Sequence, residues 1–345
     1  SVASRGLGDV YKRQGRGPAW SNSLFEDNAE FGLGMRMAAN VQTELARRRL
    51  QEVSSQLDPE FVEDLLHAPQ LTEHDLQSQQ HRVKELQTKL ANMEQTPAVR
   101  DLMSVADHLL RRSVWIIGGD GWAYDIGSSG VDHVLASGRD VNVLVLDTEV
   151  YSNTGGQASK STPLGAVAKF ASAGKPTAKK DMALQAIAYG SVYVARVALG
   201  ADPQQTLRAF REAEAYPGPS LIIAYSHCIA HGYDLRNGLD QQYKAVHCGH
   251  WPLMRYNPVL ADEGRNPFLL DSPKPDETWR EYTKLELRYR MLQKAHPEEA
   301  ERLLDLGQRQ VERRYAEYAE MASRTAENFA VDARMSEFAA SSNRA

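Results

Sequence analysis

Two short polar segments each follow a predicted β-strand, and together they could hold a divalent cation. Gly118–Trp122 (GGDGW) follows the apolar run VWII, and Asp147–Gln157 (DTEVYSNTGGQ) follows VNVLVL. Segments that leave neighbouring parallel strands meet at one edge of the sheet, so both can face the same ligand. An aspartate inside such a turn repels a bare pyrophosphate, but it suits a pyrophosphate that is bridged by Mg²⁺. The pattern therefore indicates a metal–diphosphate site.

The glycines of the first segment do not form a dinucleotide-binding fingerprint. That fingerprint needs a third glycine three residues after Gly121, where this chain has Tyr124, and glycine returns only at Gly127. A simple Gly-Asp-Gly turn without a ligand stays open as the structural alternative. Twenty-six residues separate Gly121 from Thr148, which suits one helix and one strand.

The amino-acid sequence of these segments closely resembles that of one protein family. GDGWAYDIG combined with DTEVYSNTGGQ is similar to the single-chain pyruvate:ferredoxin (flavodoxin) oxidoreductases. Three further segments match the same family, and the resemblance extends over about residues 15–323: GRGPAWSNSLFEDNAEFG at 15–32, KFASAGK at 169–175 and NPFLLDS at 266–272. The chain thus looks like the C-terminal, thiamine diphosphate-binding part of such an enzyme, and we expect it to be a fragment of a longer protein.

The resemblance implies a set of Mg²⁺ ligands. The carboxylate of Asp120, the hydroxyl of Thr148 and the backbone carbonyl of Val150 would bind the Mg²⁺ that bridges to the cofactor diphosphate. All three are hard oxygen donors, as Mg²⁺ requires, and we expect them about 3 Å apart when the metal is bound. Most thiamine enzymes have asparagine at the position of Thr148, whereas the single-chain oxidoreductases share the threonine.

Four further residues are implied as contacts of the cofactor. Gly119, Gly121 and Trp122 belong to the turn around the diphosphate, and Phe25 matches an aromatic wall of the thiazolium pocket. A phenylalanine that enters a helix is otherwise an ordinary core residue.

Asn153 and Cys228 are the implied reactive residues. Asn153 matches a residue beside the thiazolium and the substrate, where its amide could donate to a developing oxyanion; the alternative is a turn asparagine. Cys228 matches one of four ligands of a 4Fe–4S cluster, the other three lying upstream of this sequence. The alternative for Cys228 is an inert small core residue. Cys248 has no counterpart among the ligands.

A zinc site is a competing hypothesis for one stretch of the chain. Six potential ligands crowd between residues 227 and 250: His227, Cys228, His231, His247, Cys248 and His250. Their spacing is irregular for zinc, and the family pattern shares only Cys228, so we favour the cluster hypothesis.

The predicted fold that positions these residues is an α/β parallel sheet flanked by helices, with added helical segments. Residues 113–226 contain short β-branched runs separated by helical patterns at 124–137, 181–190 and 203–214. Continuous apolar strands that alternate with helices indicate a parallel sheet covered on both faces. We expect loops and a short helix at 227–275.

The chain divides into four predicted parts. Residues 1–14 match nothing in the pattern that follows, and we expect them to be an artefact or disordered. Residues 15–275 form the cofactor-binding α/β domain, which contains a helical insertion at 35–112. A helical extension follows at 276–323, and a frayed tail at 324–345.

Composition excludes several other functions. The 345 residues contain 40 Lys+Arg and 45 Asp+Glu, and this net charge of -5 argues against a nucleic-acid binder. No apolar run approaches the roughly 18 residues of a membrane span. Two cysteines exclude a disulfide scaffold and favour the reducing cytoplasm.

The function implied by the resemblance is oxidative decarboxylation of pyruvate with coenzyme A. Acetyl-CoA and CO₂ are the products, and ferredoxin or flavodoxin takes the electrons. The full-length enzyme would be a homodimer, and this fragment alone should be inactive. Other 2-oxo acid oxidoreductases and an NADP-linked pyruvate oxidoreductase stay open as alternatives. A non-catalytic nucleotide-binding domain and a helical scaffold fit the two loop motifs less well.

Overall fold

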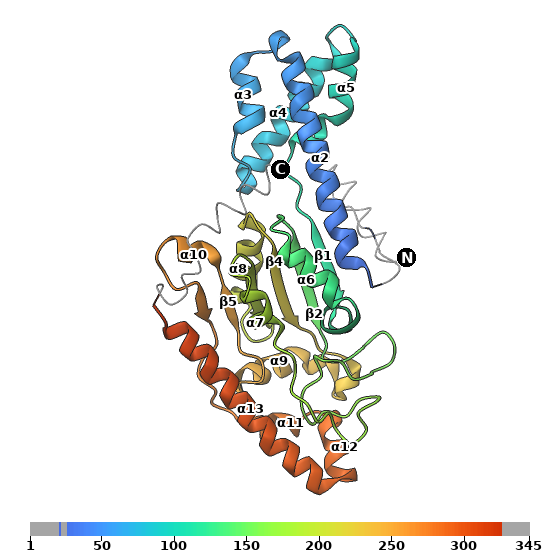
Figure 1. Cartoon of the computed structure of the whole chain (residues 1–345), viewed down its shortest axis with the longest axis vertical. Coiled ribbons are helices and arrows are strands. Elements are labelled where there is room, and N and C mark those ends of the chain that lie inside the picture. Colours follow the sequence, from blue (N-terminus) through green and yellow to red (C-terminus); the bar gives the residue numbers. More distant parts are fainter. Residues whose placement is uncertain (1–20, 22–25, 326–345) are drawn as a thin grey trace.

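The computed structural model describes residue 21 and residues 26–325. Phe25, residues 1–14 and the predicted tail beyond residue 325 lie outside the described residues. The molecule is elongated, with a helical bundle at one end, a β-sheet in the middle and a long C-terminal helix along the opposite side (Figure 1). Within the described range, no helix combines the length and the apolar character needed to cross a membrane.

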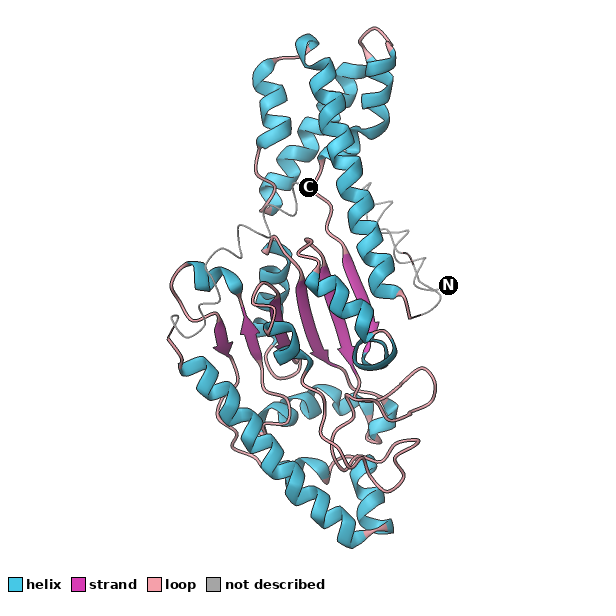
Figure 2. Ribbon diagram, viewed as in Figure 1, coloured by secondary structure: helices cyan, strands magenta, loops and turns pink. Residues whose placement is uncertain are grey.

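Among the described residues, six strands form one sheet in the order β1-β2-β4-β3-β5-β6. Four of them are parallel neighbours: β1 (Trp115–Gly119), β2 (Asn142–Asp147), β4 (Ser220–Tyr225) and β3 (Tyr193–Val197). These strands are the predicted β-branched runs. Because they are parallel, β1, β2 and β4 end at the same edge, which lies at the bottom of the sheet in Figure 2.

The other two strands were not predicted. β5 (Met254–Tyr256) pairs antiparallel with β3, and β6 (Phe268–Leu270) pairs antiparallel with β5, so the complete sheet is mixed. The prediction of only loops and a short helix at 227–275 was therefore wrong for these segments. Each strand has three residues, too few for a sequence period. Tertiary contacts hold them instead, since Arg255 on β5 forms ion pairs with Asp271 at 2.8 Å and Glu212 at 2.6 Å.

Helices cover both faces of the parallel strands. On β3, Tyr193, Ala195 and Val197 pack with residues of α8 (Pro203–Ala215). The alternate residue Val194 belongs to the core that contains Met182 of α7 (Met182–Ile187). A π-helical turn (Gly121–Ile126) and α6 (Ser128–Ala136) follow β1. The coverage is incomplete over β1 and β2, where Ile117 and Leu146 are 39% and 41% exposed.

The N-terminal helices form a bundle with its own hydrophobic core (Figure 1). In the described part of the chain its α-helices are α2 (Asn28–Val53), α3 (Pro59–His67), α4 (Glu73–Ala91) and α5 (Pro97–Val105). Side chains such as Leu50, Leu86 and Leu102 are fully buried in it. The helical region begins at Asn28 rather than at residue 35, and the first turns of α2 belong to the sheet core through Ala29 and Leu33.

The remaining helices follow the fourth parallel strand. They are α9 (Gly238–His247), α10 (Pro258–Asp262), α11 (Trp279–Thr283), α12 (Leu287–Ala295) and α13 (Pro297–Ser323). The long helix α13 packs against β6, where the rings of Phe268 and Tyr318 meet edge to face at 5.4 Å. Near its end, the side-chain amide of Asn266 donates to the carbonyls of Met321 and Ala322.

Candidate functional site

The ends of β1 and β2 bring three oxygen atoms together. Asp120 is the first residue after β1, and Thr148 is the first after β2. The Thr148 hydroxyl donates to Asp120 Oδ1 at 2.8 Å, and the same hydroxyl oxygen lies 3.0 Å from the carbonyl oxygen of Val150. One hydroxyl proton cannot satisfy both acceptors at once. The cluster is therefore rich in hard oxygen lone pairs and suits a small divalent cation.

Asp120 lies in an enclosed environment. Its side chain is 1% exposed, and the Ser161 hydroxyl donates to Oδ2 at 2.6 Å. Burial, together with the negative charge of Asp147, raises the pKa of Asp120 to about 6, although hydrogen bonds from Ser161 and Thr148 oppose this shift. A bound cation would favour the ionised carboxylate. Sequence reasoning missed Ser161, because nothing in its local context marks it as a partner of Asp120.

The turn that carries the Thr148 hydroxyl and the Val150 carbonyl has an unusual backbone conformation. Glu149 has a φ of 61°, the left-handed region that non-glycine residues rarely adopt. Its backbone N–H donates to Asp147 Oδ1 at 3.0 Å. On the other side, the ring Nε2 of His231 lies 2.7 Å from the carbonyl oxygen of Thr148, so this nitrogen carries the proton. Hydrogen bonds on both sides thus hold the turn.

The glycines of the GDG segment have different surroundings. A Cβ built on Gly119 would meet nothing within 4 Å, so the backbone is open to close approach on this side. A Cβ on Gly121 would lie 2.5 Å from the Tyr151 ring, so only glycine allows this packing. Trp122 packs against Gly118 and Gly127. An open backbone beside three oxygen donors fits a metal-bridged diphosphate.

The two implied reactive residues lie beyond the ends of β2 and β4. Asn153 is exposed in the turn at residues 152–155. Cys228 comes three residues after β4 and is 8% exposed, and its Sγ lies 3.2 Å from the hydroxyl oxygen of Ser152. The residue next to Asn153 therefore contacts Cys228, so the structure brings both segments to one edge of the sheet.

In the part of the chain that the structure describes, no group of three or more His, Cys, Asp or Glu side chains is placed to hold a metal ion, which gives the competing zinc hypothesis no support. His250 bonds to Glu149 at 2.9 Å, and His247 bonds to Asp276 at 2.8 Å. Cys248 follows Cys228 by 20 residues in the sequence and is buried. Burial raises the pKa of its thiol to about 12. These side chains serve separate local contacts.

A buried ionic cluster supports the turn, and sequence reasoning did not find it. Glu149 is at its centre and contacts Lys179, His250 and Arg288. Burial opposes the ionisation of Glu149, but these three partners outweigh it and lower its pKa well below the ordinary value. These partners are distant in the sequence and follow no spacing rule. The only sequence signal for the cluster is Glu149 itself, an acidic residue between the two predicted ligands Thr148 and Val150.

One family model matches the part of the chain that contains the parallel strands and the candidate site. Residues 91–224 match the family model described as "Thiamine pyrophosphate enzyme, C-terminal TPP binding domain". This region includes β1, β2, β3 and nearly all of β4, together with Asp120, Thr148 and Val150.

Individual curated relatives match a longer part of the chain than the family model does. The chain is 56% identical over 313 residues to a pyruvate-flavodoxin oxidoreductase of Trichormus variabilis, an alignment that covers 90% of this chain and 26% of that protein. It is 49% identical over 317 residues to the pyruvate:ferredoxin oxidoreductase of Moorella thermoacetica, covering 90% of this chain and 27% of that protein. These matches confirm the resemblance predicted from the motifs. The chain spans about a quarter of the length of these curated relatives.

Among solved structures, a 2-oxoglutarate:ferredoxin oxidoreductase from Magnetococcus marinus, with 2-oxoglutarate, coenzyme A and succinyl-CoA bound, aligns with a TM-score of 0.32 and 24% identity. The alignment covers 34% of this chain and 40% of that chain.

Proposed function

We propose that this chain is the thiamine diphosphate-binding part of a pyruvate:ferredoxin or pyruvate:flavodoxin oxidoreductase. The observation that carries the proposal is the convergence of the Asp120, Thr148 and Val150 oxygens at the edge of a domain that matches thiamine pyrophosphate enzymes. The names of the relatives support pyruvate as the substrate and flavodoxin or ferredoxin as the acceptor. In this reaction pyruvate and coenzyme A yield acetyl-CoA, CO₂, one proton and two electrons.

The chain's own residues would bind and orient the cofactor. Asp120, Thr148 and Val150 would hold Mg²⁺, and the open backbone at Gly119 would admit the diphosphate. Gly121 and Trp122 would shape the turn around it, and Phe25, which lies outside the described residues, would contact the thiazolium ring. When bound, thiamine diphosphate supplies the electron sink for decarboxylation.

Two residues would serve the reaction itself. The exposed amide of Asn153 would donate to the substrate oxygen on which negative charge develops. Cys228 would provide one thiolate of a 4Fe–4S cluster that accepts electrons. The chain contains only two cysteines, so the other ligands would come from elsewhere in the longer protein.

The proposal extends to the assembly and the compartment. The α/β domain at residues 15–275, including the helices at 35–112, would bind the cofactor, and residues 276–323 would brace it. The full-length enzyme would form a homodimer and work in the cytoplasm. The two buried free cysteines support a reducing compartment.

Substitution of Asp120 tests the proposed metal site. In the full-length oxidoreductase, Asp120→Ala should abolish thiamine diphosphate binding at physiological Mg²⁺, because the diphosphate loses its bridging cation. Titration calorimetry measures this loss. Asp132→Ala is the control, since Asp132 is an exposed residue of α6 that bonds to Tyr189. Wild-type affinity in the Asp120 variant would rule out the assignment.

A further inference from the structure

We propose that Glu149 is a positioning residue for the metal site. Its buried carboxylate holds a left-handed turn that aims the Thr148 hydroxyl and the Val150 carbonyl at one point. Glu149 does not contact the cation or the substrate in this proposal. The inference deepens the proposed function and rests on it, because it assumes that the three oxygens bind Mg²⁺.

The backbone at Glu149 gives the turn its shape. Glu149 is the single residue between Thr148 and Val150, and its φ of 61° bends the chain between them. After this bend, the Val150 carbonyl oxygen lies 3.0 Å from the Thr148 hydroxyl oxygen. A non-glycine residue in this region is strained and persists only where its surroundings over-determine its conformation. The turn therefore needs a compensating interaction.

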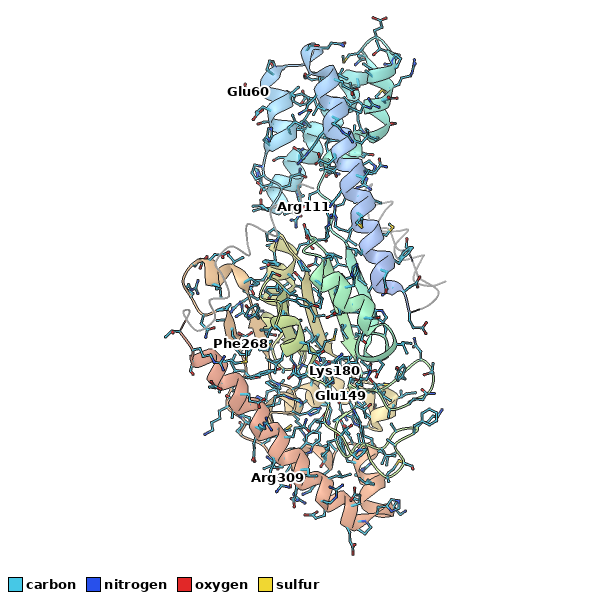
Figure 3. The ribbon with its side chains drawn as sticks, viewed as in Figure 1. Glu60, Arg111, Glu149, Lys180, Phe268 and Arg309 are labelled. Carbon is cyan, nitrogen blue, oxygen red and sulfur yellow. The ribbon has the colours of Figure 1, made fainter. Side chains whose placement is uncertain are left out.

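The carboxylate of Glu149 supplies that interaction. The side chain is fully buried, and Oε1 accepts from His250 Nε2 at 2.9 Å and from Lys179 Nζ at 3.2 Å. Oε2 accepts from Arg288 Nη2 at 2.7 Å. These three donors come from widely separated parts of the chain, and each is buried. Figure 3 shows Glu149 near the lower end of the sheet.

The donors are themselves fixed. Lys179 Nζ also bonds to Asp147 Oδ2 at 2.8 Å, and the other oxygen of Asp147 accepts the backbone N–H of Glu149 at 3.0 Å. Arg288 Nε bonds to Glu286 Oε2 at 2.6 Å. Lys179 thus bonds both to Asp147, which precedes the turn, and to Glu149 within it. Arg288 connects the turn to the start of α12. The carboxylate cannot rotate without breaking charged, buried contacts.

Glutamate at this position differs from glycine in what it adds to the turn. Glycine would adopt a positive φ without strain, but it would also populate other conformations and would carry no anchor. A glutamate here accepts the backbone strain and adds three charged or polar contacts. This choice is expected where a turn must hold one conformation, because misplaced ligands weaken metal binding.

The test compares Glu149 with a carboxylate that forms an ion pair elsewhere in the full-length oxidoreductase. Glu149→Gln keeps the side-chain shape but puts an amide opposite the Lys179 and Arg288 donors, and Glu149→Ala removes the anchor. Asp271→Asn is the control, since Asp271 pairs with Arg255 on β5 and takes no part in the cluster around Glu149. Calorimetry measures Mg²⁺ affinity at fixed thiamine diphosphate, and the Mn²⁺ EPR spectrum reports ligand geometry.

We expect Mg²⁺ affinity to fall about 10- to 100-fold in both Glu149 variants, as for other outer partners of metal ligands, with an altered Mn²⁺ spectrum. Asp271→Asn should stay within about threefold of the wild type. If Glu149→Ala does not fold, Glu149→Gln decides the test. Wild-type affinity in Glu149→Gln, or an equal loss in Asp271→Asn, would overturn the inference. Asp120→Ala separates the two levels: if it also keeps wild-type affinity, the proposed function itself fails.

Discussion

At the scale of single residues, the site is defined by oxygen donors with complementary roles. Asp120 provides charge, Thr148 provides a hydroxyl, and Val150 provides a backbone carbonyl. Their separations of 2.8 and 3.0 Å agree with the spacing of about 3 Å expected around Mg²⁺. Their roles as ligands stay a prediction, as do those of Gly119, Gly121, Trp122 and Phe25.

Asn153 allows a prediction about catalysis rather than binding. Asn153→Ala in the full-length enzyme should lower kcat about 10- to 1000-fold, by analogy with the loss of one oxyanion donor. Cofactor affinity should not change, because the side chain is exposed and is not one of the three proposed Mg²⁺ ligands. Steady-state kinetics and calorimetry check the two parts. Thr154→Ala is the control, since it removes only a loop bond to Gln157. An unchanged kcat would leave Asn153 a structural turn residue.

The two cysteines should respond differently to the same substitution. Cys228→Ala should lose or degrade one 4Fe–4S cluster, measured as iron content and as the EPR signal, and pyruvate-driven reduction of ferredoxin should fall with it. Cys248→Ala should keep all its iron, because that thiol is buried beside the Ala245 carbonyl. Full iron content in both variants would contradict the cluster role of Cys228.

At the scale of elements, the site depends on the strand ends rather than on the helical bundle. The bundle has a separate core, and none of the described residues assigned to the site belongs to it. A helix that packs apart from the site can therefore lose stability without changing cofactor binding.

Leu86 tests this separation. It is fully buried in α4, and Leu86→Ala should lower the opening free energy of that helix by about 2–5 kcal/mol, the usual cost of truncating a core leucine. Hydrogen exchange of peptides from α4 measures the effect, and the affinity for thiamine diphosphate should stay unchanged. Leu71→Ala is the control because Leu71 is 70% exposed. Unchanged protection of α4, or a lost cofactor, would contradict the separation.

At the scale of the whole molecule, the chain holds only part of the proposed chemistry. It spans about a quarter of the length of its relatives, and it contains two cysteines, whereas a 4Fe–4S cluster needs four thiolates. The chain expressed alone and treated anaerobically with iron and sulfide should therefore hold no stoichiometric cluster. Iron analysis and visible absorbance measure this. A stable cluster with four irons per chain would show that the ligand assignment is wrong.

The sequence by itself determined the class of fold and the places where the site begins. β-branched runs predict parallel strands from local order, and the residue after each strand necessarily lies at the carboxyl edge. Asp120 and Thr148 could be assigned to one site for this reason, and the resemblance around them is confirmed by relatives. These patterns depend only on residues close together in the chain, so they can be recognised in the amino-acid sequence.

Only the tertiary structure decided how the site is held. Ser161 reaches Asp120, and His250 and Arg288 reach Glu149, across 41, 101 and 139 residues. β5 and β6 form strands because β5 pairs with the edge of β3 and β6 pairs with β5. Arg255 on β5 also forms ion pairs with Glu212 and Asp271. Contacts of this kind depend on how distant segments pack, and no periodicity or spacing encodes them.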